Sequence, residues 1–505
     1  MPDANAPTPL RRIAVVDVGS NSLRLVVFER LGGALLPLLN EKVMCGLGRG
    51  IAASGRLNAE GMALAYPNLQ RFIALARALG VDHLAIIATA AVREASDGRA
   101  FAAEIEHQCG VPVRIVDGAE EGRLSAAGVL AGNPSADGVV GDLGGGSVEL
   151  VPVSGPARLI GGGISLPLGP LRLAEFGDNR RALLDAIDRA VERSPLLNSA
   201  AGKSLYLVGG AWRAIARLHM EQSRYPLHII HQYTVARRSA EAFLDLIGGI
   251  SRRSLERIGG LSRRRLEAVP LAAIILRRLI AAGRPERIVF SAFGLREGYA
   301  YGLLPSEPRS DPLIGACVGM ALTQSRWHSD GDRLQRWIAP LFPNLPPSRQ
   351  RLHRAACWLS DIAWTEHPDY RAEQAFYRTL RMPVAAIGHP ERGFIACALH
   401  ARYGGAADDP IKTAIAGLLD ESEAAQARGL GLGLRLAYTL CGGALDLLEQ
   451  VELKRQGAAL LLELPASGNL FIGEAVQRRL DALGRALGLP TRTTRQSPIA
   501  AALAS

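Results

Sequence analysis

Two glycine-rich turns, each opened by an aspartate, carry the residue types and spacing in this chain that can do chemistry. The first runs from Asp17 to Ser22 and the second from Asp142 to Ser147, and each follows an apolar run. Glycine lets successive backbone N–H groups converge on an anion, and serine and asparagine add short donors. An aspartate repels a bare phosphate, so a divalent cation must bridge the two. The turns therefore predict a phosphate site that uses Mg²⁺, with Mn²⁺ as the alternative ion.

The candidate phosphate-binding residues are the small residues of these turns, a third glycine pair and one arginine. They are Ser20, Asn21, Ser22, Arg93, Gly144, Gly145, Gly146, Ser147, Gly209 and Gly210. A guanidinium group can hold a phosphate through two parallel hydrogen bonds. Arg93 either contacts phosphate in this way or lies solvated on a helix, and we favour the phosphate contact.

Four carboxylates near the turns are candidates for metal binding or proton transfer. Asp142 and Glu149 flank the second turn, and Asp17 opens the first, so these three are the candidate metal ligands. Glu149 can alternatively face solvent from its strand. Glu121 follows a short apolar run: it is either a carboxylate favoured at a helix start, or the base that orients and deprotonates water for attack on phosphorus.

The elements that must position these residues repeat along the chain. An apolar strand, an Asp-x-Gly turn and a second strand occur twice, about 125 residues apart, which indicates two related domains facing each other across a cleft. Strands alternate with helices, so the class is α/β. The local patterns predict strands at 13–17, 23–28, 83–88 and 113–116, and a helix at 62–79 that ends at Gly80.

The pattern changes after residue 302. Pro305, Pro308 and Pro312 predict a linker, followed by helices to about residue 402. A strand at 458–464 and a helix at 472–487 capped by Gly488 then return, and the tail from Thr491 is predicted to be a loose end. We expect four domains, at 1–136, 137–303, 304–425 and 426–505.

Composition excludes several classes of protein. Among 505 residues, 48% are hydrophobic and 21% charged, which excludes a wholly disordered chain. No apolar run is long enough to span a membrane, and the first ten residues lack the apolar centre of a secretory signal. The six cysteines are widely spaced and form no CxxC pair, so we expect reduced, buried thiols in a cytoplasmic protein.

The net charge of +10 suits an anionic partner, although the strong preference for arginine over lysine can also reflect a GC-rich genome. Ten arginines between Ser251 and Arg287 form either a phosphate-binding track or a solvated helix face. No nucleic-acid recognition motif accompanies this charge, so nucleic acid is not an expected partner.

Six short motifs occur in one order over about the first 300 residues. They are Asp17–Ser22, Thr89–Ala95, Glu120–Arg123, Asp142–Glu149, Val208–Gly210 and Gly294–Gly298. Together they resemble the exopolyphosphatase/guanosine pentaphosphate phosphohydrolase family. The resemblance implies two actin-like domains of the ribonuclease-H type, Mg²⁺-dependent hydrolysis of terminal phosphates and a homodimer. It also implies roles: Glu121 as the base on water, Asp142 and Glu149 beside the metal, and both turns with Arg93 on the phosphate chain.

The chain departs from the family pattern at a few positions. Ala211 stands where a threonine usually follows the glycine pair, so one hydroxyl contact is missing, and Val148 replaces a threonine in the second turn. Both changes concern ligand contacts and neither affects a proposed catalytic carboxylate. The helical region around His353 is similar to HD-domain phosphohydrolases, but Ser360 replaces the histidine that would precede Asp361. We therefore expect a degenerate HD-like domain without its own metal, followed by a small α+β domain.

Three functions fit these observations. The favoured one is an exopolyphosphatase that releases terminal orthophosphate from inorganic polyphosphate. The alternatives are hydrolysis of the 5′-phosphate of guanosine pentaphosphate (pppGpp), a nucleotide related to ppGpp, and a non-catalytic sensor of polyphosphate or nucleotide. The sensor is disfavoured because Glu121, Asp142 and Glu149 are all present.

Overall fold

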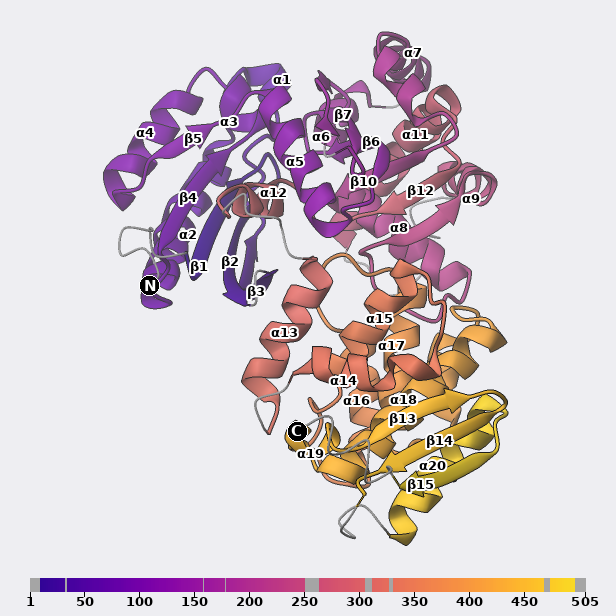
Figure 1. Ribbon diagram of the computed structural model, residues 1–505. Coiled ribbons are helices and arrows are strands. Elements are labelled where there is room, and N and C mark those ends of the chain that lie inside the picture. The colour runs from indigo at the N-terminus through magenta and orange to yellow at the C-terminus, as the bar shows by residue number, and fades with distance from the viewer. Residues whose placement is uncertain are drawn as a thin grey trace. The chain divides into compact units, whose positions relative to one another are not determined.

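The computed structural model separates into two compact units, Met1–Arg30 with Leu35–Pro308, and Leu31–Ala34 with Arg309–Ser505. It describes residues 10–31, 34–157, 159–177, 179–249, 263–304, 311–326, 330–466 and 473–495. Figure 1 shows the helices and strands of both units.

The first sheet of unit 1 has the order β3-β2-β1-β4-β5. Its strands are β1 (Arg12–Val18), β2 (Leu23–Leu31), β3 (Ala34–Val43), β4 (His83–Ala88) and β5 (Val113–Ile115). The β1–β2 pair is antiparallel, whereas β4 and β5 continue parallel to β1. The helices in and around this sheet are α1 (Ile51–Ser54), α2 (Ala59–Ala78), α3 (Ala90–Glu94), α4 (Gly98–Cys109), α5 (Gly118–Gly132) and, from the end of the unit, α12 (Leu295–Gly302). Apolar residues of α2 and α4 pack on one face of the sheet, and those of α5 and α12 pack on the other.

The second sheet repeats this order and adds two strands, one at its edge and one beside β7. Its order is β11-β12-β10-β6-β7-β8, with β9 also pairing with β7. The strands are β6 (Asp137–Leu143), β7 (Val148–Ser154), β8 (Leu159–Ile160), β9 (Ile164–Leu166), β10 (Ser204–Gly209), β11 (Tyr233–Ala236) and β12 (Arg287–Phe290). The associated helices are α6 (Pro170–Leu173), α7 (Arg180–Glu192), α8 (Gly210–Gln222), α9 (Arg237–Gly249) and α11 (Arg263–Gly283). Because β6 and β7 correspond to β1 and β2, the chain contains two α/β domains of actin-like type, as the repeat in the sequence predicts.

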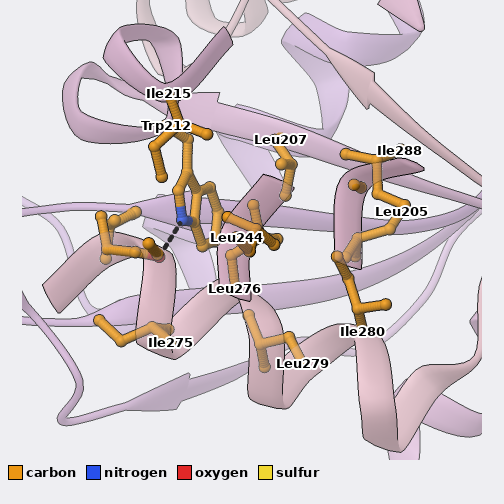
Figure 2. Packing of buried hydrophobic residues seen from close by; sticks show 14 of the residues in the cluster. Leu205, Leu207, Trp212, Ile215, Leu244, Ile275, Leu276, Leu279, Ile280 and Ile288 are labelled. Carbon is orange, nitrogen blue, oxygen red and sulfur yellow. Dashed lines mark hydrogen bonds between the residues drawn. The ribbon is translucent and has the colours of Figure 1, made fainter. Parts of the chain in front are cut away.

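The core of the second domain is built around Trp212 at the start of α8, as Figure 2 shows. Its indole is fully buried, and its N–H donates to the carbonyl oxygen of Ala272 at 3.2 Å. Leu205 of β10 lies beside Ile280 of α11 and Ile288 of β12 in the same cluster. The buried indole N–H is therefore satisfied, as a polar group in an apolar core must be.

Unit 2 is mainly helical and ends in a small sheet. Its helices are α13 (Pro312–Gln324), α14 (Gly331–Ile338), α15 (Pro347–Trp358), α16 (Arg371–Leu380), α17 (His389–Arg402), η4 (Pro410–Ile415), α18 (Glu421–Cys441), α19 (Leu445–Leu448) and α20 (Glu474–Leu487). The strands β13 (Glu452–Gln456), β14 (Ala459–Leu464) and β15 (Thr491–Arg495) pair in that order. Helix α18 packs against both α17 and α20, and the expected domain boundary at 425/426 falls inside it.

Helix ends are predicted well where glycine stops the helix. Gly80 follows α2 with φ of 63°, and Gly488 caps α20 in the left-handed conformation with φ of 68°. Two other predictions are wrong. Pro312 is the first residue of α13, where its missing N–H is tolerated, and Asp311 caps that helix. Thr491 begins β15, which is no loose end because it pairs parallel to β14 after the crossover through α20. Pro305 and Pro308 lie outside the described residues.

The cysteine side chains match the expectation from their spacing. All six cysteines are buried and unpaired, as expected. Within the described ranges, no helix is both long and apolar enough to cross a bilayer.

Helices α5 and α12 approach each other at glycine residues (Figure 1). A Cβ on Gly298 of α12 would overlap the carbonyl oxygen of Leu124 on α5, and a Cβ on Gly128 of α5 would overlap that of Gly294. The contact therefore requires glycine on both helices, because neither backbone can retreat without disturbing the sheet that it covers.

We predict that Gly298→Ala destabilises unit 1 by about 2 kcal/mol or more, because the methyl group forces the two helices apart. Differential scanning calorimetry of the full chain measures the loss as a lower Tm. Gly302→Ala is the matched control, since Gly302 ends the same helix and a Cβ there meets nothing within 4 Å. Equal melting temperatures for the two variants would contradict the close-packing explanation.

Candidate active site

The two Asp-x-Gly turns have the same backbone geometry. The N–H of Gly19 donates to the carbonyl of Ser22 at 3.1 Å, and that of Gly144 donates to Ser147 at 3.0 Å. Strand register then places Arg24 opposite Asp17 and Glu149 opposite Asp142. The repeat thus extends to the hydrogen bonds, but one hairpin carries an arginine where the other carries a glutamate.

The two turns lie against each other. A Cβ on Gly145 would lie 2.9 Å from the Cβ of Ser20, which is itself buried. The carbonyls of Gly145 and Gly146 accept hydrogen bonds from Leu171 and Gly169 at 2.9 and 3.0 Å. The cavity beside them has a volume of about 10 Å³, enough for about one water molecule, so a phosphate group needs the turns to separate.

The other candidate phosphate-binding residues flank these turns. The carbonyl of Asn21 accepts from Gly46 at 3.1 Å, which ties the first turn to the segment after β3. Gly209 ends β10 with φ of 115°, where a Cβ would overlap the carbonyl oxygen of Leu143 at the end of β6. Gly210 is the first residue of α8. The glycine pair therefore lies beside the second turn, as a shared site requires.

Helix α5 positions Glu121. The Asp117 side chain caps this helix by accepting from the N–H of Glu120 at 2.8 Å, and Glu121 follows with 7% of its surface exposed. Arg93 donates to Glu121 Oε2 at 3.0 Å and to the carbonyl of Val116 at 2.8 Å. The arginine predicted as a phosphate contact is therefore also the ion-pair partner of the predicted base.

Serine hydroxyls orient the other two carboxylates. Ser125, one turn after Glu121 on α5, donates to Asp142, and Ser165 of β9 donates to Glu149 Oε1 at 2.8 Å. The second oxygen, Oε2 of Glu149, is buried and lacks a hydrogen bond of good geometry. Glu149 is only 1% exposed, so the solvated alternative for it is wrong.

Burial raises the pKa of every carboxylate in this group. Burial and then the negative charge of Glu149 raise the pKa of Glu121 well above its ordinary value, against the opposing effect of Arg93. Burial likewise raises the pKa of Glu149 to about 7, opposed by the Ser147 and Ser165 hydroxyls. The pKa of Asp142 is raised by burial too. The group therefore needs a further positive charge to be fully ionised at neutral pH.

A hard divalent cation fits this need. Asp142 and Glu149 face each other across the hairpin, and Mg²⁺ usually takes one or two carboxylates and completes its shell with water and phosphate oxygens. Among the described residues, no three acidic, histidine or cysteine side chains converge as a ready metal site. Asp17 instead accepts from Arg296 at 3.1 Å, so its role as a metal ligand stays a prediction.

A cluster of arginines faces the same turns. Arg24 and Arg296 lie near Asp17, and Arg213 interacts with Arg296 and Asp142. Burial, followed by the charge of Arg296, lowers the pKa of both Arg24 and Arg213 to about 10. Arginines that repel one another in a buried place favour an anion between them. The site thus has an acidic part around Glu121, Asp142 and Glu149 and a basic part around these three arginines. Asp17 and Glu297 supply negative charge within the basic part.

The three arginines were missed as site residues from sequence, although two signals existed. Arg213 is the fourth residue of α8, just as Arg93 is the fourth residue of α3, and both helices follow a central strand. Arg296 lies within the Gly294–Gly298 motif. Arg24 gives no local signal, because its position opposite Asp17 depends on strand register.

The arginine-rich segment gives little support for a phosphate-binding track. Arg277 pairs with Glu241 and Asp245, and Arg278 pairs with Asp188, so both are engaged on helix surfaces. Arg252, Arg253 and Arg257 lie outside the described residues.

In unit 2, the residues that prompted the HD-like interpretation are packed in the core. Asp361 is 2% exposed and accepts a bidentate pair from Arg326, at 2.8 and 3.1 Å. His353 lies between the rings of Phe342 and Phe394. Burial, together with the charge of Arg349, lowers the pKa of His353 to about 4.

This histidine predicts an acid-side loss of stability in unit 2. In the unfolded chain this histidine is protonated below about pH 6.5, whereas in the folded chain it stays neutral down to about pH 4. The free energy of unfolding therefore falls as the pH falls through this window, by about 3 kcal/mol in all. His353→Leu should flatten the dependence of Tm on pH between 4 and 6.5. The exposed His367→Leu is the control, and an unchanged slope in His353→Leu would contradict the prediction.

Comparison with known proteins identifies relatives of both units. Residues 26–307, more than half of the chain, match the Ppx/GppA phosphatase family, and residues 313–492 match the C-terminal domain of exopolyphosphatases. The crystal structure of the Aquifex aeolicus member of the Ppx/GppA family is similar, with 23% identity and a TM-score of 0.51 over 58% of this chain and 97% of that chain. An exopolyphosphatase from Cytophaga hutchinsonii gives 24% identity and a TM-score of 0.53 over 58% and 97%. At these identities the structural likeness shows the fold.

Proposed function

The chain belongs to the Ppx/GppA phosphatase family, and we propose that within this family it is an exopolyphosphatase that releases terminal orthophosphate from inorganic polyphosphate with Mg²⁺. The observation that carries the proposal is the division of one buried site into an acidic part and a basic part. A phosphate chain with a bound cation has complementary charges, because its anionic oxygens can pair with the arginines and its metal ion with the carboxylates.

In the proposed reaction, Glu121 orients a water molecule and takes its proton as the water attacks the terminal phosphorus. Its raised pKa suits this role, because a base works best when its pKa lies near the working pH. Arg93 holds Glu121 Oε2 at 3.0 Å and so fixes the direction of the carboxylate. Without that contact the carboxylate is free to rotate away from the water.

The remaining groups bind and neutralise the phosphate chain. In this proposal, Arg24, Arg213 and Arg296 hold its oxygens together with N–H groups of both turns. Asp142 and Glu149, oriented by Ser125 and Ser165, are the residues that would hold Mg²⁺. When bound, the ion neutralises charge on the transferring group. The turns, which lie against each other, must open for entry and close again to exclude water.

Two observations favour polyphosphate over pppGpp as the substrate. The second half of the chain matches the exopolyphosphatase C-terminal domain, and one structural relative is described as an exopolyphosphatase. We place the reaction in the cytoplasm, which suits a protein with six buried, unpaired cysteines.

The test uses Glu121→Gln and the adjacent Glu120→Gln as its matched control. Glu120 pairs with Arg114 and Arg123 at the helix surface, so its loss should leave activity nearly unchanged. Glu121→Gln should reduce orthophosphate release from long-chain polyphosphate by about 10²–10⁴-fold, because it removes the base but keeps the side-chain shape. Polyphosphate affinity should stay within a few fold of the native value.

The same assay distinguishes the alternatives when pppGpp is run in parallel. Faster release from pppGpp would assign the chain to nucleotide hydrolysis and overturn the polyphosphate proposal. No release from either substrate by the native chain would overturn the enzyme proposal.

A further inference from the structure

A cavity of about 170 Å³ lies within unit 2, between α17, η4 and α18. Its apolar wall includes Ala401 of α17, Ile415 of η4, and Ala424 of α18. Two cations, Lys412 and Arg428, line the same cavity. It shares no residue with the carboxylate–arginine site of unit 1.

Among the described residues, the hydrogen bonds of both cations go to backbone oxygens. Lys412 Nζ donates to the carbonyl of Ala407 at 2.6 Å, and an Arg428 nitrogen donates to that of Gly405 at 3.4 Å. In the part of the chain that the structure describes, neither has a carboxylate within salt-bridge distance. Asp409, which precedes η4, instead pairs with His400 at 3.1 Å. Asp408 and Asp409 act on Lys412 only at longer range.

The positive charges of Lys412 and Arg428 can therefore be balanced by a bound anion. Burial, then the charge of Arg428, contributes to lowering the pKa of Lys412, so the two cations repel each other across the cavity. An anion between them would relieve that repulsion and complete the hydrogen bonding of the guanidinium, which is shaped for two parallel bonds to an oxyanion.

The cavity also limits what such an anion can be. A volume near 150 Å³ suffices for a molecule the size of benzene, whereas drug-sized ligands need about 300 Å³ or more. Two cations match a dianion better than a monoanion, and the apolar wall suits a carbon body of a few atoms.

From these features we infer that the cavity binds a small organic phosphate monoester, with the phosphate on Lys412 and Arg428 and the apolar body against Ile415 and the alanines. This site would give unit 2 a ligand of its own, which the proposed hydrolysis at unit 1 does not require.

The probe is phenyl phosphate, titrated into the full chain by isothermal calorimetry with EDTA present, beside inorganic phosphate and benzoate. Phenyl phosphate should bind more tightly than either, because it alone combines a dianion with an apolar body. The double variant Lys412→Met/Arg428→Met should weaken its binding by at least about tenfold, since each charge-assisted hydrogen bond contributes on that scale. The double variant Arg455→Met/Arg492→Met, at exposed positions of β13 and β15, is the charge-matched control and should bind normally.

A second variant tests the cavity without changing charge. Ala424→Leu fills the space beside Arg428 and should also weaken phenyl phosphate by tenfold or more, with a native Tm confirming that the unit is folded. Unchanged affinity in either variant would overturn the inference. Equal affinity for phenyl phosphate and inorganic phosphate would overturn the assignment of an organic ligand.

Discussion

Burial of several carboxylates in one small space is the constraint on which the site depends. Glu121, Asp142 and Glu149 are in electrostatic contact, and burial raises the pKa of each. Such a group is unfavourable unless positive charge is brought to it, because burial and mutual repulsion raise these pKa values despite the hydrogen bonds from serine hydroxyls. Arg93 supplies one charge, and a divalent cation with its phosphate supplies what is still lacking.

The fold provides the positive charge by using the same hairpin twice with a different residue at one position. Both domains present the same hairpin, but the residue opposite the aspartate is Arg24 in one and Glu149 in the other. Helix α5 carries Glu121, the proposed base, beside the acidic hairpin, and helix α12 carries Arg296 beside the basic hairpin. The two helices pack against each other at glycine residues. The packing of these two helices therefore sets the distance between the acidic and basic parts of the site.

The sequence predicts the features that depend on neighbouring residues. Both turns, the carboxylates, the ends of α2 and α20 and the α/β repeat follow from local signals such as glycine after a helix. The basic part of the site does not, because Arg24 and Arg213 acquire their role from strand register and helix packing. Pairing between distant segments also explains the error at β15. Arg277 and Arg278 show the reverse case, in which a dense run of charge is used for surface ion pairs.

The central claim is that the buried charges form one site for a phosphate chain together with Mg²⁺. Its most direct test is the Tm of unit 1 in the native full-length chain, measured by calorimetry with methylenediphosphonate, which cannot be hydrolysed, in Mg²⁺ or in EDTA. The two ligands together should raise the Tm well beyond the sum of their separate effects. At a ligand concentration of a hundred times the Kd, the free energy of unfolding should rise by about 2.7 kcal/mol. An equal rise in EDTA, or no rise with both ligands, would contradict the claim.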